Sequence, residues 1–199
     1  MSQPVSKFFL IGLLVAGLEE FITQGVLKQT YAGWILPTIV AFLPFLLIVR
    51  CIGQFLMRRI SESGAILIYY LAAGGIGLLV EWFLIGLSPW RDPGAPAFLM
   101  LIFQLGMFSF WGGVAFAPQL LLDKRDSVSR VRKSYLRFLI GGMAVIYGLT
   151  FLVPEKARFL ASIASVLATF LGLNLFYFQY IRITGRPEPA RATPIHAEG

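Results

Sequence analysis

Groups that could carry redox or metal chemistry are scarce in this chain. Its 199 residues include a single cysteine, Cys51, and a single histidine, His196. One cysteine excludes an intramolecular disulfide and a cysteine-based zinc cluster, and one histidine in a polar terminal segment excludes the usual His and Cys metal-ligand spacings. The sequence also lacks a glycine-rich phosphate loop and a serine nucleophile elbow. We therefore expect no cofactor and no metal ion.

Charged residues are few as well. They make up 14% of the sequence, whereas apolar residues make up 57% and the mean hydropathy is +0.77. Soluble domains contain about 25% charged and about 45 to 50% apolar residues. Several apolar runs approach or exceed the roughly 20 residues that a helix needs to cross a bilayer. This composition is typical of a membrane protein.

Charges and turn residues divide the apolar sequence into segments that we interpret as six transmembrane helices. The expected helices cover residues 7–27, 33–58, 65–87, 96–122, 135–153 and 157–181. Membrane β-strands are excluded because the runs are about twice too long and do not alternate polar with apolar residues. We expect an all-α, polytopic membrane bundle of three hairpins that forms one domain over residues 1–184. The polar, proline-containing residues 185–199 should form a disordered cytoplasmic tail.

The distribution of lysine and arginine predicts the orientation of these helices. Most of the basic residues fall before the first helix, in the second and fourth connections, and after the last helix. Because basic loops stay on the cytoplasmic side, we expect both termini inside, in a cell membrane such as the bacterial cytoplasmic (inner) membrane. This bias accounts for the net charge of +7 without nucleic acid. The basic segment 123–133 is expected to be a loop that sets the topology, or alternatively a contact for anionic lipids.

Two glutamates stand out within the apolar segments. Glu20, in the stretch GLEEFITQG, lies roughly 10 Å below the outer end of the first helix, and Glu81 lies roughly 9 Å below that of the third. Both should therefore occupy the same depth in the outer half of the bundle. An unpaired carboxylate in hydrocarbon costs about 2.5 to 3.5 kcal/mol on insertion scales. We expect these groups to be protonated, hydrated, or bound to a cation.

Other polar side chains are expected near the same depth. Gln24 lies on the face of Glu20, four residues further on, while Gln104 and Tyr147 come from the fourth and fifth helices. Together with the glutamates they are our candidate ligand-binding or ion-binding residues. The alternative is that they form hydrogen bonds that only hold the helices together. Small residues should allow close helix packing, namely Gly74, Gly77, Gly106, Gly112, Gly113, Gly141 and Gly142.

The stretch around Glu20 resembles the first motif of the CPBP intramembrane proteases, the type II CAAX-processing family. That motif has two adjacent glutamates followed three residues later by arginine and often glycine. Here Glu19 and Glu20 are followed by Gln24 and Gly25, so glutamine replaces the arginine. The resemblance implies an intramembrane enzyme that uses a glutamate and membrane histidines. No histidine lies in the expected helices of this chain.

Three classes of function remain open. The first is a non-catalytic membrane bundle that assembles with other membrane proteins or with itself, and the lack of catalytic motifs favours it. The second is a small proton-coupled or cation-coupled carrier or channel that uses Glu20 and Glu81. The third is an enzyme acting on a lipid-soluble substrate, for which a second catalytic group is missing. The sequence favours a non-enzymatic role.

Overall fold

The computed structural model describes residues 4–21, 33–86, 88 and 96–185, and every regular element in these ranges is helical. The elements are α1 (Val5–Glu20), α2 (Ile35–Leu56), α3 (Glu62–Val80), η2 (Glu81–Ile85), α4 (Ala97–Leu122), α5 (Asp126–Arg137), η3 (Phe138–Gly142), α6 (Met143–Leu152) and α7 (Glu155–Thr184). The π-helical turns η2 and η3 continue α3 and α5. The all-α prediction is confirmed. The expected tail lies outside the described residues, apart from Gly185.

Three of the described helices are long and apolar enough to cross a membrane. They cover Thr38–Leu56, Glu62–Ile85 and Ala97–Leu122, and the shorter apolar stretch Val5–Leu18 lies in α1. Each coincides with one of the expected segments. The composition therefore predicted the positions of these helices well, because long apolar runs leave little choice of secondary structure.

The basic segment 123–133 is not a loop throughout, which corrects the prediction. From Asp126 onward it forms α5, whose side chains Val128, Val131 and Tyr135 are buried. These residues recur at intervals of three and four, the spacing of one face of an α-helix. The burial of that face stabilises a helix although most of its other residues are polar.

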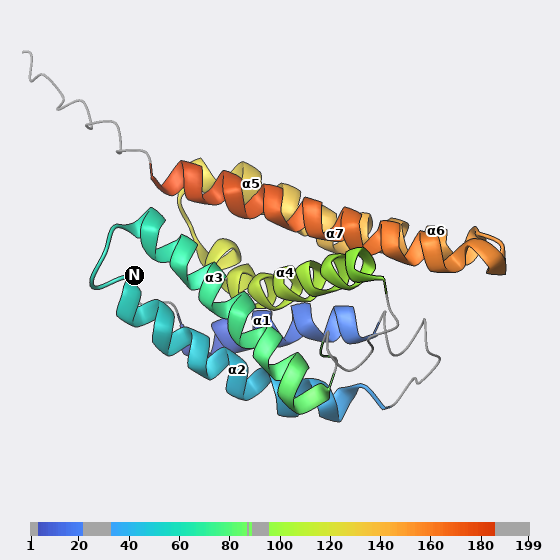
Figure 1. Cartoon of the computed structure of the whole chain (residues 1–199). Coiled ribbons are helices and arrows are strands. Elements are labelled where there is room, and N and C mark those ends of the chain that lie inside the picture. Colours follow the sequence, from blue (N-terminus) through green and yellow to red (C-terminus); the bar gives the residue numbers. More distant parts are fainter. Residues whose placement is uncertain (1–3, 22–32, 87, 89–95, 186–199) are drawn as a thin grey trace, which may run out of the picture.

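Helix α4 lies at the centre of the molecule, between the α1–α3 group and α7 (Figure 1). Its second half is almost fully enclosed, with Val114, Ala115, Phe116 and Ala117 inaccessible to solvent. Trp111 stacks on Phe42 of α2, with ring centroids 4.4 Å apart. A helix that is apolar on every side has no preferred solvent face, so it can serve as the axis on which the others pack.

Glycines bring α3 and α4 close together. A Cβ atom on Gly77 would overlap the side chain of Trp111, and one on Gly112 would lie 2.6 Å from a ring carbon of Tyr70. Each bulky ring of one helix thus fills the space that a glycine of the other leaves. The prediction that small residues permit close packing is confirmed here. It is not shown for Gly141, where an added Cβ atom would meet nothing within 4 Å among the described residues.

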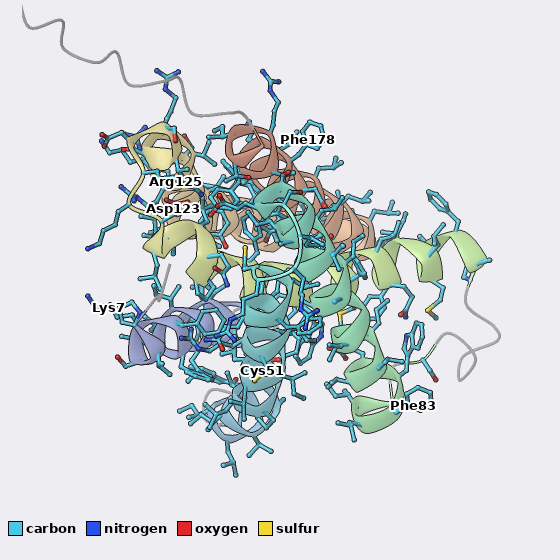
Figure 2. The ribbon with its side chains drawn as sticks, turned by 90° about the vertical axis from the view of Figure 1, so that its left-hand side faces the viewer. Lys7, Cys51, Phe83, Asp123, Arg125 and Phe178 are labelled. Atoms are coloured by element: carbon cyan, nitrogen blue, oxygen red, sulfur yellow. The ribbon has the colours of Figure 1, made fainter. Side chains whose placement is uncertain are left out.

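The third hairpin consists of α5, η3 and α6 running antiparallel to α7, and it joins the rest through α7 and α4 (Figure 1). One end of the molecule, where the third hairpin contains α5, holds the starts of α1 and α3 and the ends of α2, α4 and α7. The view turned by 90° shows Asp123 and Arg125 side by side (Figure 2). We call this end the basic end.

Candidate functional site

Glu81 is buried at the junction of α3 and η2, with 4% of its surface exposed. Its Oε1 accepts a hydrogen bond from Nε1 of Trp111, at 2.8 Å. Its Oε2 is also buried and has no hydrogen-bond partner among the described residues. One half of the carboxyl group is therefore held in place, and the other half is free to bind a proton or a cation.

The π-helical turn sets the direction of this side chain. The amide of Gly86 donates to the carbonyl of Glu81, at 2.8 Å, and closes a turn one residue wider than that of an α-helix. Gly86 ends the helix with a φ of 90°, a left-handed conformation that glycine adopts without strain. Such wide turns are rare in proteins and frequently lie at functional sites.

A second indole ties the same turn to α4. Nε1 of Trp82 donates to Oε1 of Gln104, at 2.6 Å, and Gln104 is itself buried. The two hydrogen bonds run in opposite directions, because η2 provides one tryptophan and α4 provides the other. Gln104 was one of the predicted site residues, and the structure places it beside the turn that holds Glu81.

Glu20 is the last residue of α1 and is partly buried. It lies close enough to Glu81 for the negative charges of the two carboxylates to repel one another. The two predicted glutamates therefore lie within range of a charge–charge interaction, one at the end of α1 and one in η2. Burial and the neighbouring carboxylate both make a negative charge on Glu81 costly, so this group is suited to bind a proton or a cation.

The remaining predicted site residues are not shown to join this pair. Gln24 lies outside the described residues, and so do the side chains of Glu19 and Tyr147. Tyr147 belongs to α6, which packs mainly on α7 and η3 rather than on α3. The predicted polar layer is thus described only around Glu20, Glu81 and Gln104.

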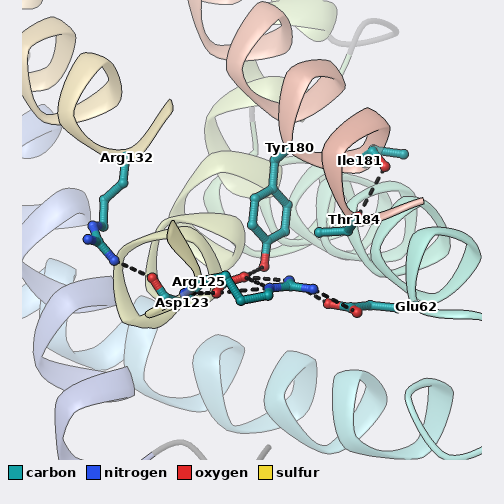
Figure 3. A network of polar contacts seen from close by, with 7 residues as sticks. All are labelled: Glu62, Asp123, Arg125, Arg132, Tyr180, Ile181 and Thr184. Atoms are coloured by element: carbon teal, nitrogen blue, oxygen red, sulfur yellow. Dashed lines mark hydrogen bonds and ion pairs between the residues drawn. The ribbon is translucent and has the colours of Figure 1, made fainter. Parts of the chain in front are cut away.

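An ionic network at the basic end was not predicted from the sequence (Figure 3). The guanidinium of Arg125 bonds to both carboxylate oxygens of Asp123, at 3.0 and 3.1 Å from Nε, and reaches Glu62 of α3, at 2.6 and 3.0 Å. Tyr180 of α7 donates its hydroxyl to Asp123, at 2.8 Å, and Arg132 of α5 donates to the backbone carbonyl of Asp123. The network connects α3, α4, α5 and α7 at one point.

The charges in this network favour the ionised forms. Burial alone would raise the pKa of Asp123, but the hydrogen bonds from Arg125 and Tyr180 and the guanidinium charge outweigh it and hold that pKa below its usual value. The bonds to Asp123 and Glu62 raise the pKa of Arg125. The only sequence signal for this network was the short spacing of Asp123 and Arg125, since Glu62 and Tyr180 are distant in the chain.

A cavity of about 660 Å³ opens beside this network. Its walls include Arg50 and Gln54 of α2, Arg58 in the turn after α2, and Glu62, Asp123 and Arg125 of the network. Nothing in the sequence alone placed α2 opposite the segment after α4. This cavity is the second candidate site.

A third polar group lies between α3, α4 and α7. Tyr70 donates to Oδ1 of Asn174, at 3.0 Å, and its hydroxyl lies 3.2 Å from that of Ser109. Nδ2 of Asn174 donates to Ser109, at 3.0 Å, and closes the triangle. Because its members satisfy one another, this cluster is best explained as a device that fixes the position of α7 on α3 and α4.

Comparison with known proteins gives no assignment. No family model, no curated protein and no solved structure matches the chain. The described residues also contain no group of three or more His, Cys, Asp and Glu side chains that could hold a metal ion.

Proposed function

We propose that the chain is a multi-pass integral membrane protein of a cell membrane, with six spans and both termini on the cytoplasmic side. The apolar length of α2, α3 with η2, and α4 supports this, as does the return of successive helices to the basic end. Arg50, Arg58 and Arg125 gather there, and basic residues remain preferentially on the cytoplasmic side of a membrane. The Glu20–Glu81 pair then lies toward the opposite, outer side.

We further propose that this protein is a small carrier or channel that binds protons at the Glu20–Glu81 pair. The observation that carries this proposal is the buried Oε2 of Glu81, which has no hydrogen-bond partner among the described residues and lies near a second carboxylate. A carboxylate in this position is costly unless it binds a proton or a cation. The indole of Trp111 lowers the cost for one oxygen only.

Proton flux into liposomes that contain the purified protein and a pH-sensitive dye tests this function. We expect flux above that of protein-free liposomes, and a return to the protein-free rate in Glu81→Gln, which keeps an acceptor for Trp111 but cannot ionise. Glu155→Gln removes an exposed acid at the start of α7 and should leave the flux unchanged. Flux that persists unchanged in Glu81→Gln would overturn the assignment of Glu81.

A second candidate function is that of a non-catalytic subunit in a larger membrane complex. The position of α6 favours it, because this helix packs mainly on α7 and η3 and exposes Val145, Leu149 and Leu152. Native mass spectrometry of the protein released gently from its own membrane distinguishes the candidates. A second membrane protein bound in fixed ratio would support the subunit, whereas a chain that runs alone would not.

The contacts of Glu81 do not favour the third class, an intramembrane enzyme. General acid-base catalysis needs a partner within hydrogen-bond reach of the reacting group. The partner of Oε1 is an indole N–H, which neither activates water nor accepts a proton.

A further inference from the structure

The cavity at the basic end is separate from the Glu20–Glu81 pair. Glu62 and Glu81 both belong to the continuous helix of α3 and η2, and a separation of 19 positions along it spans roughly 28 Å. The cavity therefore lies at the opposite end of the bundle and calls for its own explanation.

The charges around the cavity are unequal. Its two acidic side chains, Glu62 and Asp123, are both hydrogen-bonded to Arg125. Arg50 and Arg58 bring two further positive charges to the wall. The cavity is thus lined by three guanidinium groups and two carboxylates, and the two carboxylates share the single guanidinium of Arg125.

The arrangement of α2 aims these groups at one space. Arg50 and Gln54, four residues apart, lie on one face of α2, and Arg58 follows in the turn after the helix ends at Leu56. The guanidinium of Arg50 lies over the ring of Phe8, 5.0 Å from its centroid, which fixes its direction. On the other wall, ion pairs and hydrogen bonds with Asp123 and Glu62 hold Arg125. The directions of Arg50 and Arg125 are therefore set before a ligand enters.

We propose that this cavity binds a phosphate ester, supplied by the head group of an anionic phospholipid. Guanidinium groups match phosphate oxygens with paired hydrogen bonds, and they do so best when their direction is already fixed. A volume of about 660 Å³ is much larger than a bare phosphate and agrees with a complete head group. The cavity lies where α2, α4 and α7 end, which in a membrane is the level of the lipid phosphates.

A soluble phosphate ester would present the same chemistry, and the test separates the two sources. Full-length protein in a neutral detergent is titrated with phosphatidylglycerol, with phosphatidylcholine and with glycerol 3-phosphate, and bound ligand is counted by native mass spectrometry. We expect phosphatidylglycerol to bind tightest. Glycerol 3-phosphate that binds as tightly and displaces the lipid would overturn the lipid source and leave a soluble phosphate ester as the ligand.

Two neighbouring arginines provide a matched control. Arg58 lines the cavity, whereas Arg59 points elsewhere, over the ring of Phe55 at 5.4 Å. Arg58→Gln should weaken phosphatidylglycerol binding by about tenfold, the usual effect of losing one charge-assisted hydrogen bond. Arg59→Gln removes the same charge and should leave binding unchanged. Equal losses in both variants, or equal binding of both lipids to the natural protein, would show a general surface attraction and overturn the proposal.

A second variant shows whether weaker binding comes from the removed guanidinium or from a change in local structure. Arg50→Gln removes a guanidinium of α2 that lines the same cavity, and it should weaken phosphatidylglycerol binding by a similar factor. Its α-helical circular dichroism should match that of the natural protein. Binding that is unaffected in both Arg50→Gln and Arg58→Gln would exclude the cavity as the site.

Discussion

The indole of Trp111 donates a hydrogen bond to Glu81, while the neighbouring Trp82 donates one to Gln104 in the opposite direction between the same two helices. This reciprocal pair locks α3 and η2 to α4 at the depth of the Glu20–Glu81 pair. It also leaves the second oxygen of Glu81 without a donor among the described residues. Rigid support of one oxygen and freedom of the other is an arrangement suited to a group that changes its protonation state.

The energy of this contact can be measured with a double-mutant cycle. Trp111→Phe keeps a ring to stack on Phe42 but removes the N–H group. We expect the hydrogen bond to contribute about 1 to 3 kcal/mol to the free energy of unfolding in detergent. In a protein that already carries Glu81→Leu, the indole has no acceptor. Trp111→Phe should then lower the free energy of unfolding by about 1 to 3 kcal/mol less than it does in the natural protein. A coupling energy near zero would mean that the indole stabilises the bundle by packing alone.

Close packing of α3 on α4 makes a second prediction. Gly77→Ala would place a methyl group within the space of the Trp111 side chain, so the helices must separate. We expect a loss of about 1 to 3 kcal/mol in the free energy of unfolding. Gly75→Ala, two residues away on the open side, meets nothing within 4 Å. It should be neutral or slightly stabilising, because alanine favours the helix.

The helices were predictable because their signal is local. Apolar runs of about 20 residues are typical of helices that cross a membrane, so composition alone placed α2, α3 and α4. The depth assigned to Glu20 and Glu81 comes from counting residues along two helices, and it stays a prediction. Both predictions need only the rise of an α-helix and the thickness of a bilayer.

The contacts between distant segments were not predictable in the same way. Arg125 pairs with Glu62, 63 positions earlier in the sequence, and no local pattern indicates that pairing. Helix α5 is a different case, because Val128, Val131 and Tyr135 carried a readable helical spacing. That spacing is obscured by the basic residues between them, which indicate a loop that sets the topology or contacts anionic lipids. The position of Tyr147 depends on how the third hairpin packs on α4. A single sequence does not predict that packing.

The network around Asp123 predicts a dependence of stability on pH. The pKa of Asp123 is lower in the folded protein than the value of about 3.9 in an unfolded chain, so the ionised carboxylate favours folding. This contribution is complete above pH 4 and is lost as the pH falls through the lower pKa of the folded state. Asp123→Asn should therefore lower the melting temperature at pH 7, and the difference from the natural protein should shrink toward pH 3. A difference that is constant between pH 7 and pH 3 would contradict this assignment.

The orientation of the bundle can be tested with single cysteines. Cys51 is exposed, so Cys51→Ala first removes the natural thiol. Lys124→Cys then places a thiol after α4 at the basic end, and Lys156→Cys places one at the start of α7. If both termini are cytoplasmic, a membrane-impermeant maleimide added to intact cells should label only the second variant. Both cysteine variants should be labelled after the cells are opened. Labelling of Lys124→Cys alone in intact cells would reverse the topology, place the Glu20–Glu81 pair near the cytoplasm, and put the arginine-lined cavity at the outer leaflet.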